Sequence, residues 1–412
     1  MGIRNALLVV VAACSYAAPP DVLPPLFAAV HPSIASAGDT IMLEGSFSET
    51  TTVQFPGGDV RMATLHGPHR ASVTVPAGAT EGDLFVTTAN TKVGPVAFRR
   101  AGFGPSLGEF RQTVSLMQAR REFATAVVKN NVYLIGGYSG SGVLDTIEHA
   151  TIGADGALGS FTMLQIKLPA PRRHDTAVVL GDWLYVLNGG QDGPELSVVR
   201  ARILSDGTLE AFQAAGSLLQ AHSGNSAVVI GNLLYVLGGD ALEAAEIDGD
   251  TLMPFHVVDT TSVPADGPNP ISRTDAQTSV IGDSLCLIGG YDAGVMPSTT
   301  AVCAPIGSDG SLGELHRTAS EVMPRADSAN LVVGTRLYML GGTTSSSPLL
   351  SVVRVPLDPA SSFEEFAEGA MGVARQGAAA ILVGDSVCVI GGGNHDASFL
   401  DSVECAGFAP AQ

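Results

Sequence analysis

The feature that most constrains this fold is an apolar segment ending in a glycine doublet, which recurs six times at nearly constant spacing. With Asn188 standing in for a first glycine, the doublets begin at residues 136, 188, 238, 289, 341 and 391, in steps of 52, 50, 51, 52 and 50 residues. A second apolar run and a tight turn such as Gly231-Asn232 precede each doublet, a pattern typical of a β-hairpin. This regularity indicates a repeat protein in which each unit contributes one small sheet.

A second motif also recurs six times, and we interpret it as the outermost strand of a four-stranded sheet. Its copies occupy residues 106–110, 157–161, 208–212, 251–255, 311–315 and 362–366, and each ends in Phe or Leu. The first copy precedes the first doublet, and no copy follows the last one. Residues 106–114 are therefore predicted to complete the sixth sheet, which would close the ring and remove its exposed edges.

The doublet strand, with a Pro-Arg pair upstream, resembles the kelch repeat. Pro171-Arg172 and Pro324-Arg325 carry the resemblance best, and it extends from residue 103 to about residue 408. It implies an all-β chain whose residues 103–412 form a six-bladed kelch-type β-propeller. The outer-strand motif departs from the family, because Phe or Leu stands where kelch repeats typically carry Trp.

Residues 28–98 resemble the IPT/TIG type of immunoglobulin-like domain. The resemblance rests on short apolar segments separated by Gly and Pro turns, at residues 38–41, 43–45, 53–55, 73–76 and 82–86. It implies a small Ig-like β-sandwich in front of the propeller.

The first 20 residues have the pattern of an export signal followed by the start of a tether. Arg4 precedes the apolar residues 6–11, and Val11-Ala12-Ala13-Cys14 resembles a bacterial lipobox. This predicts lipidation of Cys14 and a protein exported to the periplasm, the outer membrane or the cell surface, held to the membrane only through its lipid anchor. An ordinary signal peptide cleaved near Ser15-Tyr16-Ala17 is the alternative.

Four further cysteines form two pairs of equal separation. Cys286 and Cys303 are 17 residues apart, as are Cys388 and Cys405. Repeats with Tyr at the first position carry a long side chain at the second, so Cys occurs at one position only when it occurs at the other. We therefore predict two cross-strand disulfides, which suit an exported protein. A zinc site is the weaker alternative.

One basic position recurs 16 residues before the doublets. It is occupied by Arg120, Arg172, His222, Arg273, Arg325 and Arg375, with Arg121 and Arg173 as alternatives in the first two repeats. One hypothesis is a cationic ring at the channel mouth that binds an anionic ligand. The alternative is structural: each arginine donates to blade-connecting carbonyls or pairs with Asp175, Asp275 or Asp327.

The formal charge of −19 argues against a nucleic-acid partner. Signals for an enzyme are poor: we predict no catalytic residues, metal or cofactor. The preferred function is that of a kelch-repeat binding protein that recognises a protein or glycan, including anionic ones, at the propeller mouth. The alternative is a periplasmic carbohydrate-active kelch enzyme, epimerase-like or oxidase-like. An epimerase would need an acid/base pair, for which Glu122 with His174 or His222 are the available residues.

Overall fold

The computed structural model describes residues 26–100, 103–190, 196–220, 224, 226–238, 241–258, 273–292, 296–318, 324–344, 347–356, 366–394 and 398–410. Cys14 and His222 lie outside these residues, so the predictions made for them stay predictions. The described residues form the strands β1 to β39 and no helix. Accordingly, no helix in this part of the chain could cross a membrane. The all-β class predicted from the sequence is confirmed.

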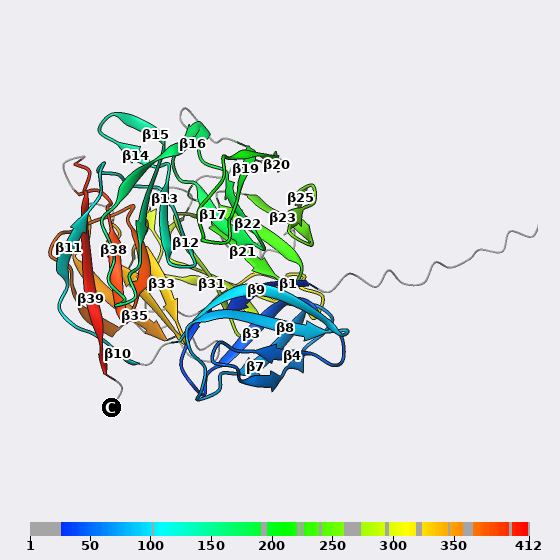
Figure 1. The fold of residues 1–412 in the computed structure, drawn as a ribbon. Coiled ribbons are helices and arrows are strands. Elements are labelled where there is room, and N and C mark those ends of the chain that lie inside the picture. Colours follow the sequence, from blue (N-terminus) through cyan, green and yellow to red (C-terminus); the bar gives the residue numbers. More distant parts are fainter. Residues whose placement is uncertain are drawn as a thin grey trace, which may run out of the picture.

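The N-terminal strands form two sheets that pack face to face (Figure 1). The first sheet has the order β1-β3-β7-β6 and the second β2-β9-β8-β4-β5. Buried side chains from both sheets, including Leu43, Val53 and Phe98, make one core. The strands are β1 (Leu26–His31), β2 (Ile34–Ala35), β3 (Thr40–Ser46), β4 (Thr52–Gln54), β5 (Val60–Met62), β6 (Thr64–Leu65), β7 (Arg70–Thr74), β8 (Gly82–Thr88) and β9 (Thr91–Arg100).

Each glycine-doublet repeat forms one antiparallel sheet, and we number these repeat sheets first to sixth. The first has β12 (Ala124–Val128), β13 (Asn131–Ile135), β14 (Tyr138–Ser139), β15 (Gly142–Thr151) and β16 (Thr162–Arg172); the second has β17 (Thr176–Leu180), β18 (Trp183–Leu187), β19 (Ser197–Arg202) and β20 (Gln213–Ser217). The third has β21 (Ser226–Ile230), β22 (Leu233–Gly238), β23 (Ala241–Asp248), β24 (Thr251–Leu252) and β25 (His256–Val257). The fourth has β27 (Gln277–Ile281), β28 (Ser284–Ile288), β31 (Ala301–Pro305) and β32 (His316–Thr318), beside a small sheet of β26 (Arg273–Thr274), β29 (Tyr291–Asp292) and β30 (Met296–Pro297). The fifth has β33 (Ala329–Val333), β34 (Arg336–Leu340), β35 (Ser351–Pro356) and β36 (Phe366–Ala370); the sixth has β37 (Ala379–Val383), β38 (Ser386–Ile390) and β39 (Ser402–Pro410), with β10 (Phe103–Leu107) and β11 (Arg111–Ser115).

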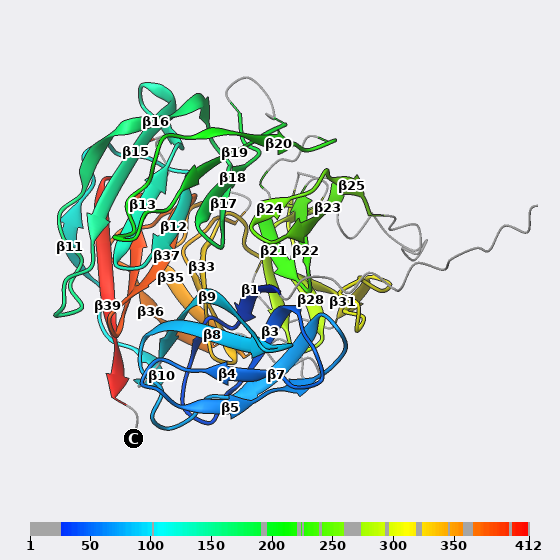
Figure 2. The same ribbon diagram turned by 45° about the vertical axis from the view of Figure 1, so that its right-hand side comes forward.

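The repeat sheets surround a common axis in a propeller-like arrangement (Figure 2). Their innermost strands contact one another in turn: β12 contacts β17, β17 contacts β21, and β21 contacts β27. Farther along, β33 contacts β37, and β37 contacts β12. The last of these contacts joins the sixth sheet to the first. The fourth and fifth sheets meet through a shared core that includes Ile281 and Leu337, so the ring is closed.

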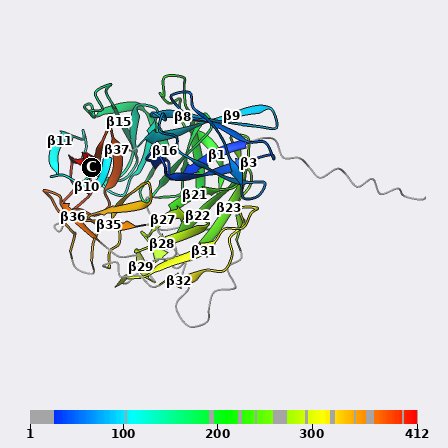
Figure 3. The same ribbon diagram turned by 90° about the horizontal axis from the view of Figure 1, so that it is seen from below.

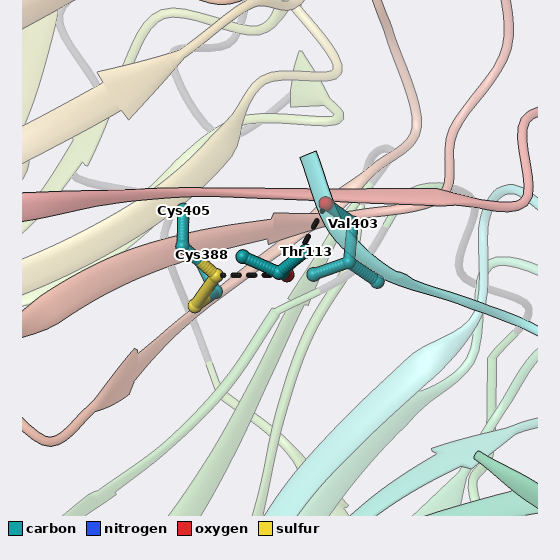
Figure 4. Close-up of a disulfide and its surroundings, with 4 residues drawn as sticks. All are labelled: Thr113, Cys388, Val403 and Cys405. Carbon is teal, nitrogen blue, oxygen red and sulfur yellow. Dashed lines mark hydrogen bonds between the residues drawn. A yellow bond between two sulfur atoms is a disulfide. The ribbon is translucent and has the colours of Figure 1, made fainter. Parts of the chain in front are cut away.

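The sixth sheet is completed by strands from the other end of the repeat region. β10 and β11 both pair with β39, and Arg111 lies opposite Cys405. This is the pairing that the order of the two sequence motifs predicts. The Cys388–Cys405 disulfide lies beside this junction, where the Thr113 hydroxyl is 3.5 Å from the Cys405 sulfur and 3.4 Å from the Val403 carbonyl oxygen (Figure 4).

Both predicted disulfides are present, Cys286–Cys303 and Cys388–Cys405, each joining facing residues of antiparallel strands. Three tyrosine repeats carry the expected partners at the same register. Tyr133 faces His149, and Tyr185 and Tyr338 face arginines, whereas Tyr235 faces Ala244 and departs from the expected pattern.

The second sequence motif is not the outermost strand itself, which corrects the prediction. In most repeats the outermost strand begins one residue after the motif, as β20 does after Phe212. The motif is instead a turn held by an isolated bridge such as Ile152 to Leu158. Its last residue is buried between sheets in several repeats, for example Phe161 and Leu315. A recurring aromatic or Leu position therefore marked inter-sheet packing rather than strand pairing.

The N-terminal sandwich packs against one end of the repeat sheets, at the turns that follow the innermost strands (Figures 1 and 3). Gly334 N–H donates to Ile34 O at 2.6 Å, and Gly231 N–H donates to the Glu44 carboxylate at 2.7 Å. Arg70 donates to Glu44 and also to Asp283, which lies at such a turn. The other end of the channel, where the innermost strands begin, is not covered by this sandwich. We call that end the mouth.

Candidate functional site at the channel mouth

The five described arginines of the predicted cationic ring are buried. Arg120, Arg172, Arg273, Arg325 and Arg375 are each at most 1% exposed. Each donates to the carbonyl oxygen of the first residue of its own doublet, at 2.7–3.3 Å. Each also donates to a backbone carbonyl and a hydroxyl on the third strand of its sheet. Because these guanidinium groups are enclosed and bonded within their sheets, the geometry favours the structural alternative over a ligand-binding ring.

The structural alternative also predicted that these arginines pair with nearby aspartates. Two of them instead form ion pairs with glutamates. Arg120 forms a buried ion pair with Glu148, at 2.8 Å, and Arg375 forms one with Glu404. Glu148 also accepts the N–H groups of Met117 and Gln118, so the carboxylate joins the arginine to the start of the neighbouring turn.

The residues that reach the mouth lie two positions after the arginine position. This position is occupied by Glu122, His174, Gly224, Asp275, Asp327 and Gly377, one from each repeat. All six have positive φ, between 55° and 62°. Backbone hydrogen bonds link neighbours around the axis: Glu122 N–H to Gly377 O, His174 N–H to Glu122 O, and Asp275 N–H to Gly224 O, at 2.8–2.9 Å. Asp327 N–H bonds Asp275 O, and Gly377 N–H bonds Asp327 O. We call these six residues the mouth ring.

The two glycines leave room for the charged side chains beside them. A Cβ on Gly224 would lie 2.0 Å from the Asp275 carboxylate, which extends across it. A Cβ on Gly377 would lie 3.3–3.4 Å from Glu122 and Asp327 side-chain atoms. The positive φ and the space at these positions both favour glycine.

His174 lies at the centre of the charged group. Its Nε2 is 3.0 Å from Glu122 Oε2, and its Nδ1 is 3.6 Å from Asp275 Oδ1. The Glu122 carboxylate also receives Arg121, at 3.1 Å, and Arg173, at 3.4 Å. Arg121 and Arg173 thus belong to the mouth, unlike the buried arginines.

The environment sets the protonation of these groups. Burial alone would lower the pKa of His174, but hydrogen bonds to Asp275 and Glu122 and the charges of both raise it to about 10. Burial opposes ionisation of Glu122, yet the hydrogen bond and charge of His174, with the two arginines, lower the pKa of Glu122. Burial, and then the charges of Asp275 and Glu122, raise the pKa of Asp327 to about 7. At neutral pH His174 is therefore an imidazolium, and Asp327 is present in both its protonated and its ionised form.

A cavity of about 280 Å³ lies at the mouth ring and continues past it along the innermost strands. Two aromatic side chains of the first and sixth repeats do not line this cavity but contact the arginines that pair with Glu122. Tyr138 and Phe399 pack edge to face with centroids 5.2 Å apart, and Arg121 lies 5.4 Å from each ring. Arg173 lies 5.0 Å from Tyr138. The mouth thus combines carboxylates, aromatic faces and paired cations.

Two mouth residues, Glu122 and His174, were identified from the sequence as a possible acid/base pair, and the structure brings them together. Asp275 and Asp327 were considered only as partners for the arginines. Counting two residues on from the arginine position in each repeat would have identified them, because they occupy the same position in the repeat as Glu122 and His174.

No family model matches the chain. The acyl-CoA-binding domain-containing protein 4 of Arabidopsis thaliana is 21% identical over 246 residues, which are 57% of this chain and 37% of the plant protein. The chain thus spans little more than a third of that relative. A solved structure titled "Structure of YjhT" is similar with a TM-score of 0.55 and 12% identity, over 70% of this chain and 95% of that one. At this identity the likeness shows a shared fold alone.

Proposed function

We propose that this protein is an exported, lipid-anchored binding protein in which a six-bladed kelch-type propeller binds a glycan at its mouth. The Ig-like sandwich would hold the propeller away from the membrane. The two disulfides support export, because such bonds persist in oxidising compartments. The closed ring of repeat sheets, each built on a glycine doublet, supports the six-bladed architecture.

The observation that carries the glycan proposal is the chemistry around the mouth cavity. The carboxyl oxygens of Asp275 and Asp327 line this cavity and can accept hydrogen bonds from hydroxyl groups, which sugars supply in adjacent pairs. Tyr138 and Phe399, which contact Arg121 beside Glu122, would add apolar surface for a sugar that extends out of the cavity on this side. The Arg173 side chain is 37% exposed and can receive the acidic group of an anionic sugar.

A glycan array on the purified protein, followed by titration calorimetry on the strongest binder, tests this proposal. We expect Asp327→Asn to weaken binding at least tenfold, since a hydrogen bond to a charged group contributes about 1.5–3 kcal/mol. Arg173→Ala should weaken only acidic glycans, and Asp59→Asn in the sandwich serves as the control. Binding that is unchanged in Asp327→Asn would refute a glycan site at the mouth. A peptide array run in parallel tests the protein-ligand alternative.

A second candidate, an epimerase-like enzyme, is favoured by the Glu122–His174 pair and by the near-neutral pKa of Asp327. A group whose pKa lies near the working pH is suited to general acid–base catalysis. An oxidase with a Tyr–Cys crosslink is disfavoured, because all four cysteines of the repeat region are paired. Proton NMR of bound sugars in heavy water would distinguish catalysis from binding. Exchange of a carbon-bound hydrogen that Asp327→Asn abolishes would indicate an enzyme.

A further inference from the structure

The end of the channel opposite the mouth is crossed by the chain segment from residue 26 to residue 34. Ala28 packs with Leu180 and Val229, on the second and third repeat sheets. Ile34 packs with Ala329 and other residues of the fifth and sixth sheets. These pairs of sheets lie on opposite sides of the ring, so the segment runs across the axis between them.

The segment forms the floor of a well that begins at the mouth. A second cavity, of about 410 Å³, is lined by His31 and Pro32 of the segment and by the innermost strands. Ala177, Gln277 and Asn330 line both this cavity and the mouth cavity. The two cavities are therefore parts of one well.

Several bonds hold this floor in place. A ring nitrogen of His31 is 2.8 Å from the Val229 carbonyl oxygen on the third sheet. Farther along the sandwich, Arg70 and Glu44 form an ion pair whose side chains are 2% and 0% exposed. Arg70 extends this pair to Asp283 at 2.9 Å. These ion pairs anchor the sandwich, which carries the floor segment, to the fourth repeat sheet, and removing one member of such a buried pair is strongly destabilising.

The space beside the floor lies to one side of the axis. A cleft of about 730 Å³ lies between the sandwich and the first and second repeat sheets. Its lining combines valines such as Val30 and Val127 with the charged side chains of Asp83, Lys129, Asp182 and Arg202. The cleft therefore does not continue the well in a straight line, and a chain that followed it would have to turn at the floor.

From this closed end we infer that the mouth receives the terminal residue of a glycan and not an internal segment. The inference rests on the proposed glycan binding and adds the form of the ligand to it. The charged side chains surround only the mouth cavity of about 280 Å³, which lies at the lower limit of small-molecule sites. The cavity below it is lined largely by apolar side chains such as Val228 and Val332, so the polar part of the well suits one sugar ring better than several. The floor segment blocks a straight path along the axis, so the residue that enters from the mouth is an end.

The test uses calorimetry with sugars built from glucose, galactose, N-acetylglucosamine and galacturonic acid. Each is offered as the monosaccharide, the linear hexasaccharide and a polymer of about 100 residues. For the sugar that binds, we expect the monosaccharide and the hexasaccharide to differ by less than about fivefold in affinity, and one protein to bind per polymer end. Asp327→Asn should weaken each interaction by the same factor, at least tenfold.

Two results would overturn the inference, and they differ in what else they refute. A hexasaccharide that binds more than 50-fold tighter than its monosaccharide, with many proteins per polymer chain, means that internal segments are bound. The proposal that the mouth binds a glycan would then remain, but the inference that it recognises the end of the glycan would be wrong. If none of the sugars binds, or if binding is unchanged in Asp327→Asn, the glycan proposal itself is wrong, and the inference that rests on it is wrong as well.

Discussion

Replacing Arg375 with Met separates the structural role of the buried arginines from a ligand-binding role. The Arg375 guanidinium donates to Gly391 O at 2.7 Å and to the carbonyl and hydroxyl oxygens of Ser402, both at 3.2 Å. It also pairs with Glu404, which is 3% exposed. Met fills a similar volume but can donate to none of these acceptors.

The expected loss follows from the partners that remain behind. Removing one member of a buried ion pair typically costs about 3–5 kcal/mol, because the other charge stays buried. Arg375→Met should therefore lower the free energy of unfolding by about that amount. Adding Glu404→Gln removes the buried charge, keeps an acceptor for the Gly372 N–H, and should recover about half of the loss.

Urea unfolding of the oxidised protein, followed by far-UV circular dichroism, measures both variants against the wild type. The control is Arg111→Met, which removes an exposed arginine of the closing strand β11. Because the ion pair of Arg111 with Glu109 is also exposed, this variant should change the unfolding free energy by less than 1 kcal/mol. If Arg375→Met unfolds like this control, or if Glu404→Gln recovers nothing, the buried pair does not stabilise the sixth sheet as argued.

Further predictions concern the disulfides, pH and the mouth ring. The double variant Cys388→Ala/Cys405→Ala should lose about 3 kcal/mol by chemical denaturation, the loop-closure value for a separation of 17 residues; no loss would mean that β10 and β11 alone hold the sixth sheet closed. Because the pKa of His174 is about 10 in the folded protein and 6.5 for a free histidine side chain, its contribution to the free energy of unfolding is complete below pH 6.5 and is lost as pH rises towards 10. Between pH 7 and pH 9.5 the free energy of unfolding should therefore fall less in His174→Gln than in the wild type, and equal falls would contradict the assignment. Gly224→Ala should lower the melting temperature more than Gly377→Ala, because only the first Cβ meets an atom closer than 3.0 Å while both positions have positive φ; equal shifts would show that the carboxylate simply moves away.

Much of the fold could be predicted because the repeat spacing reports directly on sheet geometry. The equal cysteine separations predicted the two disulfides, since residues that face each other across a hairpin must keep a constant distance along the chain. The outer motif misled because an aromatic or Leu residue at a fixed position signals burial in general. Phe161 is buried between sheets without belonging to a strand, and no periodicity in the sequence distinguishes these two cases.

The site was harder to predict because structural residues recur from repeat to repeat, whereas site residues differ between repeats. Arg120 and Arg375 recur because every repeat needs the same donors for the same carbonyl groups. The mouth ring has the same backbone in every repeat but a different side chain in most of them, so it has no pattern that a search for repetition detects. Burial distinguishes the two positions, and burial comes from the closed ring rather than from any one repeat.

This contrast explains how a near-symmetric scaffold presents an asymmetric site. The backbone hydrogen bonds of the mouth ring hold its members at one level around the axis, so any side chain placed there points towards a shared space. Glycine in the third and sixth repeats lets the flanking carboxylates extend sideways, and His174 then bridges Glu122 and Asp275 across the position of Gly224. Changing only these side chains alters the charge, the proton affinity and the shape of the mouth, while the buried arginines keep each sheet intact. The specificity of the mouth is therefore expected to change at the mouth ring before it changes anywhere else in the repeats.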